Sequence, residues 1–441
     1  MNAFQPFSER RDATLALLVG AFLILTCVSL TEVLHTSMPG NPLFWQAVAS
    51  VAALGLFIPL FMWARFSFGY LVGFNFYCMI AGYIWLSYFI VGDYDHAQAR
   101  WSLAASLLLL LVPLLFQARP LRPRFSLSAQ TMNRLLPGLL ASALLVLAWN
   151  AVYGFAFVST AEADRLRGTL SRPTVLSYID SWLAGALLPF AFAWFASRRR
   201  YVLAALSIIL IAAFYPVLLN KTVAFAGVWL PFLFILFSLV EARRAAALSL
   251  LLPLFFGLVV VWLTEIGLPK QIYVLVYGGV NYRMLAFPAM ALDRYFDFFA
   301  HHDLTHFCQI GIVRHFTGCP YQFQLGAEME QHYHMGNLNG SLFATEGIAS
   351  VGPILAPLSA LVCGLILSIG NSVSAHLPTR FVATSAGVAI QVLVNVPLSA
   401  SLLSNGLLLL FLLWYVTPPL SYPSPTSSAA LLRARASGGE G

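Results

Sequence analysis

Charge is scarce in this chain. Only 9% of its 441 residues are Asp, Glu, Lys or Arg, whereas soluble domains average about 25%. Hydrophobic residues make up 60%, and apolar runs recur along the whole length that reach the roughly 20 residues needed to cross a hydrocarbon core. This composition excludes a soluble globular protein and predicts a protein that crosses a membrane many times.

Lysine is nearly missing, and so are several motifs. Lysine occurs only at Lys221 and Lys270, and the remaining positive charge is arginine. No stretch interleaves basic and aromatic residues as nucleic-acid sites do, so nucleic acid is not an expected partner. The chain has neither an H-E-x-x-H motif nor a cysteine pair at zinc spacing, so we expect no metal. No internal repeat of the kind found in many transporters is present.

The apolar runs predict an all-α polytopic membrane fold, because backbone groups in lipid must be hydrogen-bonded within their own segment. About twelve spans are expected, at 13–33, 45–64, 70–91, 102–117, 135–158, 178–197, 201–219, 222–240, 246–264, 341–369, 381–399 and 403–419. Nine of them fall in 1–264 and three in 341–420, around a large external loop at 265–340. The tail at 421–441, rich in Pro, Ser, Gly and Arg, is expected to be disordered.

The arginines predict the orientation. With the N-terminus in the cytoplasm, most of them fall in inside segments, such as 198–200, as the positive-inside rule requires. The short outside segments then carry only Arg100, Arg165, Arg167, Arg172 and Lys221. Both termini are therefore expected inside, and the 265–340 loop outside, in the periplasm of a Gram-negative cell. Its apolar parts, "YVLVYGGV" and "MLAFPAMAL", predict short interfacial or re-entrant helices.

Histidines gather in that loop. Residues 301–340 hold six of the nine histidines. His302 and His306 have the i, i+4 spacing of a helical metal pair, but such pairs are common in a His-rich loop, and a wet interfacial patch is the favoured interpretation. One of these histidines, for which we select His306, is a candidate general base, because histidine titrates near neutral pH. The "DYD" at Asp93 and Asp95 has the D-x-D form of many glycosyltransferases, yet a solvated helix cap is the simpler interpretation.

The external arginines point to an anion. A guanidinium group makes paired hydrogen bonds with phosphate oxygens, so outer arginines near the membrane surface could hold a lipid-linked pyrophosphate. For any one of them, contact with lipid headgroups or local carboxylates is the simpler interpretation, but for the group we favour the pyrophosphate. The arginines concerned are Arg165, Arg167, Arg172, Arg283, Arg294 and Arg314.

Two further features of the outer side bear on function. Glu346 lies near the start of the tenth expected span. Since ionisable groups in a membrane face a polar cavity or a partner, we expect it to face a polar cavity at the outer boundary and to pair with an external arginine. Cys308 and Cys319 both lie in the external loop. Because the periplasm is oxidising, a disulfide between them is plausible.

Two segments carry a family resemblance. "NYRMLAFPAMALDRYFDFF" (281–299) and "GNLNGSLFATEGIASVGPILAPLSALVCGLILS" (336–368) together resemble the Wzy-type oligosaccharide repeat-unit polymerases of O-antigen and exopolysaccharide synthesis. The shared pattern is an arginine before an apolar-aromatic stretch, then an Asn-rich entry to a helix with a Gly-x-x-Gly-like motif. In this chain the residues of that pattern are Arg283, Asn337, Asn339, Gly347 and Gly352, with Pro353 where a second glycine is usual.

The resemblance implies a reaction. Such enzymes join undecaprenyl-pyrophosphate-linked repeat units outside the bacterial inner membrane, and they need neither metal nor nucleotide because pyrophosphate is already a good leaving group. It also implies a lipid-linked oligosaccharide as partner, within the bilayer, and a chain-length regulator as a further one. An O-antigen ligase-like glycosyltransferase and a transporter of lipid-linked glycans remain alternatives. The expected catalytic residues are Arg283, Glu346 and His306, and the expected substrate-binding residues are Arg165, Arg172, Arg294, Arg314, Asn337 and Asn339.

Overall fold

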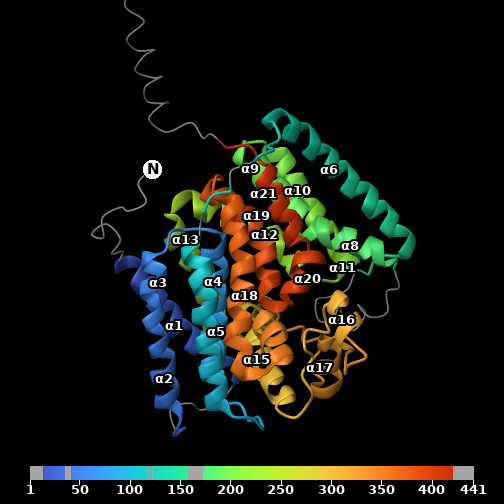
Figure 1. The fold of residues 1–441 in the computed structure, drawn as a ribbon. Helices are drawn as coiled ribbons and strands as arrows, with labels where there is room; N and C mark the ends of the chain where they lie inside the picture. Colours follow the sequence, from blue (N-terminus) through green and yellow to red (C-terminus); the bar gives the residue numbers. More distant parts are fainter. Residues whose placement is uncertain (1–12, 35–40, 118, 122, 157–171, 421–441) are drawn as a thin grey trace, which may run out of the picture.

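The structure, a computed structural model, is all-helical in the part of the chain that it describes, residues 13–34, 41–117, 119–121, 123–156 and 172–420. Ten helices in these residues are long and apolar enough to cross a membrane, as a polytopic all-α membrane protein requires. They pack as two groups that lie side by side (Figure 1).

The first group is built around α4, which is buried along its whole length. α4 packs on α1, α2, α5 and α18, and α1 packs in turn on α13. The helices of this group are α1 (Ala13–Leu34), α2 (Phe44–Ala53), η3 (Leu54–Phe57), α3 (Ile58–Trp63), α4 (Phe68–Leu86), α5 (His96–Phe116), α13 (Ala242–Glu265), η7 (Phe343–Ala349) and α18 (Ser350–Ser374).

The second group is held together by α19, which packs on α9 and α12, while α10 packs on α6, α9 and α12. The two groups meet where α19 contacts α4 and where α21 contacts α18. The helices of the second group are α6 (Ala129–Asn150), η4 (Ala151–Tyr153), α8 (Thr174–Trp182), η5 (Leu183–Leu187), α9 (Leu188–Ser197), α10 (Tyr201–Ala213), α11 (Tyr215–Leu218), α12 (Lys221–Leu239), α19 (Thr379–Asn395), α20 (Leu398–Leu403) and α21 (Leu407–Val416).

Short polar side chains start many of these helices. Ser67 accepts a hydrogen bond from Tyr70 N at the start of α4, and Asn220 accepts one from Thr222 N at the start of α12. Asp95 accepts from the backbone of Ala97 and Gln98 at the start of α5. These bonds satisfy amides that the helix itself leaves unpaired. Asp95 is therefore a helix cap, the simpler of the two interpretations of the "DYD" motif.

The last two expected spans are short in the structure. α19 has 17 residues, and the segment expected to span 403–419 contains α21, a helix of 10 residues. The ten long apolar helices correspond to the first ten expected spans. Among the described residues, the structure thus gives long apolar helices for ten of the twelve expected spans.

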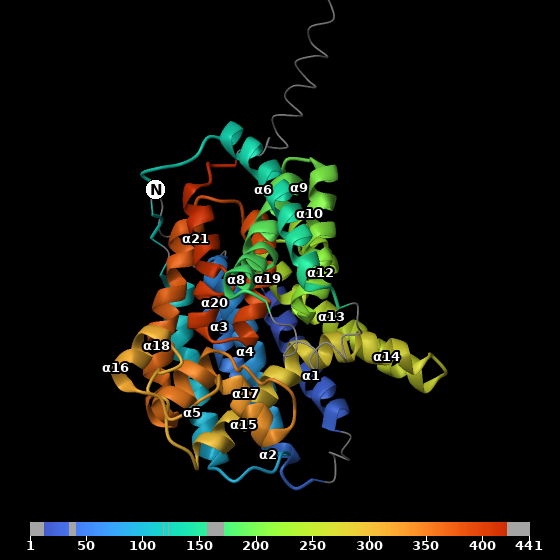
Figure 2. The same ribbon diagram turned by 90° about the vertical axis from the view of Figure 1, so that its right-hand side faces the viewer.

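The segment expected to be an external loop contains five helices: α14 (Lys270–Val276), η6 (Gly278–Ala286), α15 (Phe287–Phe299), α16 (Gly311–Thr317) and α17 (Leu325–Tyr333). η6 packs on α1, α4 and α13, and α15 packs on α4 and η7. α14 projects from the bundle, whereas α15, α16 and α17 gather at one end of it (Figure 2). We call this end, together with the 87–95 turn, the loop end. The apolar parts of this segment, where short interfacial or re-entrant helices were expected, thus form helices, and η6 and α15 pack into the first group.

Candidate functional site

Two of the expected site residues lie in π-helical segments. Arg283 is part of η6, and Glu346 is part of η7. In a π-helix the hydrogen bonds join residues five apart in the chain, one more than in an α-helix, and such segments are frequent at functional sites. Both belong to the stretches that carry the family resemblance.

η6 is tied firmly into the bundle. Asn281, fully buried, donates from Nδ2 to Ser29 Oγ (3.0 Å) on α1 and to Leu254 O (2.9 Å) on α13. Tyr277 donates its hydroxyl to Ser29 O (2.5 Å). A side chain at Gly257 would collide with Asn281, so glycine is required at that point of α13. The helix that bears Arg283 is therefore a fixed part of the fold.

Arg283 itself is half-buried and lies over an aromatic ring. Its Cζ is 4.6 Å from the centre of the Phe287 ring, one turn further along the helix. This cation–π contact holds the planar guanidinium group in one place.

Asp293 and Arg294 form the charged centre of α15. The Asp293 carboxylate is 1% exposed, and its Oδ2 lies 3.6 Å from Nη1 of Arg294, which is 22% exposed. Tyr94, from the turn before α5, donates to Asp293 Oδ1 (2.5 Å), and its oxygen lies 3.1 Å from the hydroxyl of Tyr83. Arg294 also lies over the ring of Tyr333, with Cζ 5.2 Å from its centre.

Asp297 lies one turn beyond Asp293. Its Oδ2 accepts from the Tyr333 hydroxyl (2.7 Å), and its Oδ1 accepts from Asp93 N (2.8 Å). His301 Nε2 lies 2.8 Å from Asp93 O. One turn of α15 therefore joins the 87–95 turn to α17 through Asp297.

Burial governs proton binding in this cluster. It raises the pKa of Asp293, while the hydrogen bond from Tyr94 and the charge of Arg294 act in the opposite direction. Burial also raises the pKa of Tyr94 and that of Tyr333, so both keep their hydroxyl protons. The cluster thus combines a buried acid that holds its proton more strongly than usual with a partly exposed arginine.

Glu346 has other partners than expected. It is 4% exposed, and its Oε1 accepts from the backbone N (3.1 Å) and the hydroxyl (3.2 Å) of Ser399, while Oε2 accepts from the Thr345 hydroxyl (2.6 Å). No ion pair to Glu346 occurs among the described residues. The expected arginine partner is thus replaced by neutral donors that tie the tenth span to the start of α20.

The tenth span is broken just beyond Glu346. Gly352 has φ +76° and ψ 171°, a backbone conformation open to glycine. Two carbonyls near the break accept from the 304–309 loop, because Thr305 N donates to Ala349 O (2.8 Å) and Gln309 Nε2 donates to Thr345 O (3.3 Å). The glycine of the resemblance motif therefore marks a discontinuous helix.

The same loop carries the cysteines. A disulfide joins Cys308 to Cys319, the pair that the sequence offered. His306 is exposed with φ +46°, in the turn before the disulfide, and Arg314 is exposed on α16 inside the loop that the disulfide closes. No group of three or more His, Cys, Asp or Glu side chains in the described residues is placed to hold a metal.

Asn337 and Asn339 pack on a glycine. A side chain at Gly326 would meet Oδ1 of either asparagine, and Leu338 N donates to Gly326 O (3.3 Å). Tyr295 of α15 donates to Leu338 O (3.1 Å). The two asparagines therefore help to pack the 336–340 segment against α17 and α15.

The expected arginines are not gathered in one clamp. Arg172, before α8, donates from Nη1 to Val217 O and from Nη2 to Gly154 O (3.1 Å), in the second helix group. Arg165 and Arg167 lie outside the described residues. Arg283, Arg294 and Arg314 each have different neighbours, as described above, so the structure leaves Arg283 and Arg294 as the two that share one continuous helical segment.

Sequence reasoning missed the carboxylates beside Arg294. Asp293 and Asp297 have i, i+4 spacing in "LDRYFDFF", where every other residue except Arg294 is apolar or aromatic. That isolated acidic pair was the available signal, since two carboxylates on one helical face need partners when the helix is buried.

No family model, curated protein or solved structure matches this chain. The class that fold and composition define is a polytopic all-α membrane protein.

Proposed function

We propose that this protein is a membrane glycosyltransferase that polymerises undecaprenyl-pyrophosphate-linked oligosaccharide repeat units. The proposal includes a bacterial inner membrane, cytoplasmic termini, a loop end that faces the periplasm, and a chain-length regulator as a further partner. It rests on the resemblance of 281–299 and 336–368 to the Wzy-type polymerases, and on the packing of these two segments against each other in the fold.

The observation that carries it is the Asp293–Arg294–Asp297 turn. These charges lie on α15, inside the first of the two resembling segments, and α15 packs on η7 of the second. Arg294 is partly exposed while its partner Asp293 is buried. A site for a pyrophosphate next to a sugar hydroxyl needs such a combination, a reachable cation and a carboxylate held in place by a second layer of hydrogen bonds.

The reaction assigns a role to each group. A hydroxyl of the acceptor sugar attacks the anomeric carbon of the donor glycan and loses its proton to a carboxylate, for which Asp297 is the proposed base. The bond from the anomeric carbon to the pyrophosphate oxygen breaks, and undecaprenyl pyrophosphate leaves. Arg294, with Arg283 on the same helical segment, stabilises the charge that the leaving group gains. Glu346 then acts as a positioning residue for the broken helix, and His306 is the alternative base.

A deletion strain tests this function. Without the protein, the surface glycan should consist of single repeat units only. Returning the wild-type gene should restore the ladder of long chains on a gel. Purified protein in vesicles should also lengthen lipid-linked repeat units without added nucleotide. Normal ladders in the deletion strain would refute the polymerase. Loss of all surface glycan, single units included, would instead indicate the ligase-like alternative.

One observation favours a transporter as the second candidate. Transporters commonly bind their substrate where a membrane helix is discontinuous, and the tenth span is broken at Gly352, next to the buried Glu346. A transporter of lipid-linked glycans would move repeat units across vesicle membranes without lengthening them. The vesicle assay therefore separates the two functions by product size.

A further inference from the structure

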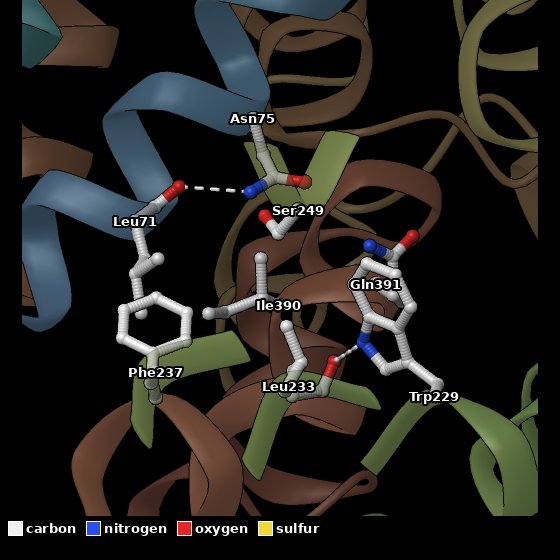
Figure 3. Close-up of a pocket in the computed structure, with 10 residues that line it drawn as sticks. Leu71, Asn75, Trp229, Leu233, Phe237, Ser249, Ile390 and Gln391 are labelled. Carbon is white, nitrogen blue, oxygen red and sulfur yellow. Dashed lines mark hydrogen bonds between the residues drawn. The ribbon is translucent and has the colours of Figure 1, made fainter. Parts of the chain in front are cut away.

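A second polar site lies inside the bundle, at the boundary between the two helix groups. A small cavity is bounded by α4 and α13 on one side and by α12 and α19 on the other. Asn75 and Ser249 face it from the first group, and Gln391 and Trp229 face it from the second (Figure 3). Asn75 and Trp229 lie near the middle of their helices, so the cavity is far from either end of the bundle.

The polar groups around the cavity have hydrogen-bonding capacity to spare. Asn75 donates from Nδ2 to Leu71 O (2.9 Å), which leaves its carbonyl oxygen as an acceptor, and Ser249 donates to Ala246 O (2.8 Å), which leaves a lone pair. The Nε2 atom of Gln391 is buried and has no hydrogen-bond partner among the described residues. In Figure 3 this nitrogen is turned toward Asn75 and Ser249 across the cavity. A donor and two acceptors therefore face one space from three helices.

The lining decides what kind of ligand fits. None of the ten described lining residues is ionisable, and besides the polar groups the walls are Leu71, Leu233, Phe237, Ala383, Gly387 and Ile390. A charged ligand would find no counter-charge in this interior. A lipid chain would leave the amide groups unpaired. The space is small and polar on one side, which suits water with two to four hydrogen-bonding partners.

We propose that this cavity is a water-binding site, in which ordered water accepts from Gln391 Nε2, donates to Asn75 Oδ1 and Ser249 Oγ, and so joins the two helix groups. The packing around the cavity supports this assignment, because α12 rests mainly on α19 and α13 mainly on α1, while α12 and α13 touch over little of their length. The site is independent of the proposed glycosyltransferase function, which lies at the loop end.

Thiol reactivity tests for water at this depth. In a background carrying Cys27→Ala, Cys78→Ala and Cys363→Ala, the Ser249→Cys variant is treated with a small methanethiosulfonate reagent, which reacts with the thiolate. A thiolate forms only where water reaches it, so we expect Ser249→Cys to react about tenfold or more faster than the matched variant Ala246→Cys. Ala246 is 1% exposed on the same helix and does not line the cavity. Equal rates in two variants with the same melting temperature would overturn the proposal.

A double-mutant cycle tests the bridge without a cysteine. Asn75→Leu and Gln391→Met each remove one end of a shared water network, so the double variant should lower the Tm by clearly less than the sum of the single shifts. Asn75→Leu combined with Asn220→Ala is the control, because Asn220 caps the start of α12 and does not line the cavity, and these shifts should add. Additive shifts for Asn75 and Gln391 would overturn the bridge.

Discussion

Arg294 and Asp293 form an ion pair of 3.6 Å (Nη1 to Oδ2) in which the acid is almost fully buried and the base is partly exposed. Neighbours on a helix point about 100° apart, so the pair sits at the edge of the buried face of α15. Tyr94 completes the surroundings of the acid from the other side of the loop end. Arg294 is thus accessible from outside while its partner Asp293 is held in the buried face of the helix. The proposed site depends on this arrangement.

The pH dependence of stability should reveal Asp293. Burial raises its pKa above the value of about 3.9 expected in the unfolded chain, so the folded protein binds this proton more tightly. Its contribution to stability is therefore largest below the unfolded pKa and declines as pH rises through the folded pKa. Asp293→Asn should remove this decline and be at least as stable as wild type at pH 7, as measured by Tm from pH 4 to 8. Asp93→Asn, at an aspartate 96% exposed, is the control, and an unchanged Tm profile for Asp293→Asn would contradict the assignment.

Arg294 should matter for glycan length, whereas Arg314 should not. Arg294→Ala removes the proposed pyrophosphate ligand and should leave mostly single repeat units, and Arg294→Lys should restore length only in part, because lysine lacks the paired donors. Arg314→Ala, at an exposed arginine of α16, is the matched control and should give normal ladders. The readout is a glycan gel with an immunoblot for protein amount. Equal ladders from Arg294→Ala and Arg314→Ala would remove Arg294 from the site.

Arg283 gives a separate test. Its guanidinium lies over Phe287 in a fixed segment, so Arg283→Lys should keep the fold yet shorten the glycan, and Arg283→Ala should shorten it further. Phe287→Leu, which removes the ring beneath the guanidinium, should have an intermediate effect. Chain length on a gel and Tm are measured together. A Tm loss that parallels every loss of length would show that Arg283 acts on stability alone.

The disulfide should stabilise the 304–309 loop, which donates hydrogen bonds near the break in the tenth span. The double variant Cys308→Ser, Cys319→Ser lacks the cross-link between two residues that lie 11 apart in the sequence. Because its unfolded chain has more conformational entropy, its free energy of unfolding should fall by about 3 kcal/mol. We expect a lower Tm and faster proteolysis of 304–320. In intact cells, maleimide labelling of the two cysteines should require prior reduction. Labelling without a reductant would show that the thiols are free.

Glu346 is expected to act through Ser399. Glu346→Ala leaves the partly buried Ser399 N–H without its acceptor, at a cost of about 1 kcal/mol, whereas Glu346→Gln keeps an oxygen there and should cost less. Ser399→Ala, which removes only the hydroxyl, should cost least. If Glu346 is a positioning residue, glycan length should fall in the same order as the Tm. A stable Glu346→Gln variant with no long chains would instead place Glu346 in the chemistry.

Much of the fold could be predicted from local sequence, because a membrane imposes its rule on each segment separately. Apolar length placed the first ten expected spans where the long helices lie. The interpretation of the "DYD" motif as a helix cap needs only neighbouring residues, and Asp95 does cap α5, although this helix starts at His96 and not at the expected residue 102. The cysteine pair was visible for the same reason, since Cys308 and Cys319 are the only cysteines of the expected outer loop.

Tertiary structure alone decided the site. The apolar parts of residues 278–299 predicted short helices in the outer loop, but not the partners of the polar residues among them. Asn281 and Asp293 find partners on α1, on α13 and in the turn before α5, and these bonds offset the cost of burying them. Glu346 meets Ser399, 53 residues away, and not an arginine. Hydropathy predicts whether each segment prefers lipid or water. A buried polar group, however, is stabilised by a hydrogen-bonding partner that can lie far away in the sequence. Only the packing of the bundle determines which partner that is.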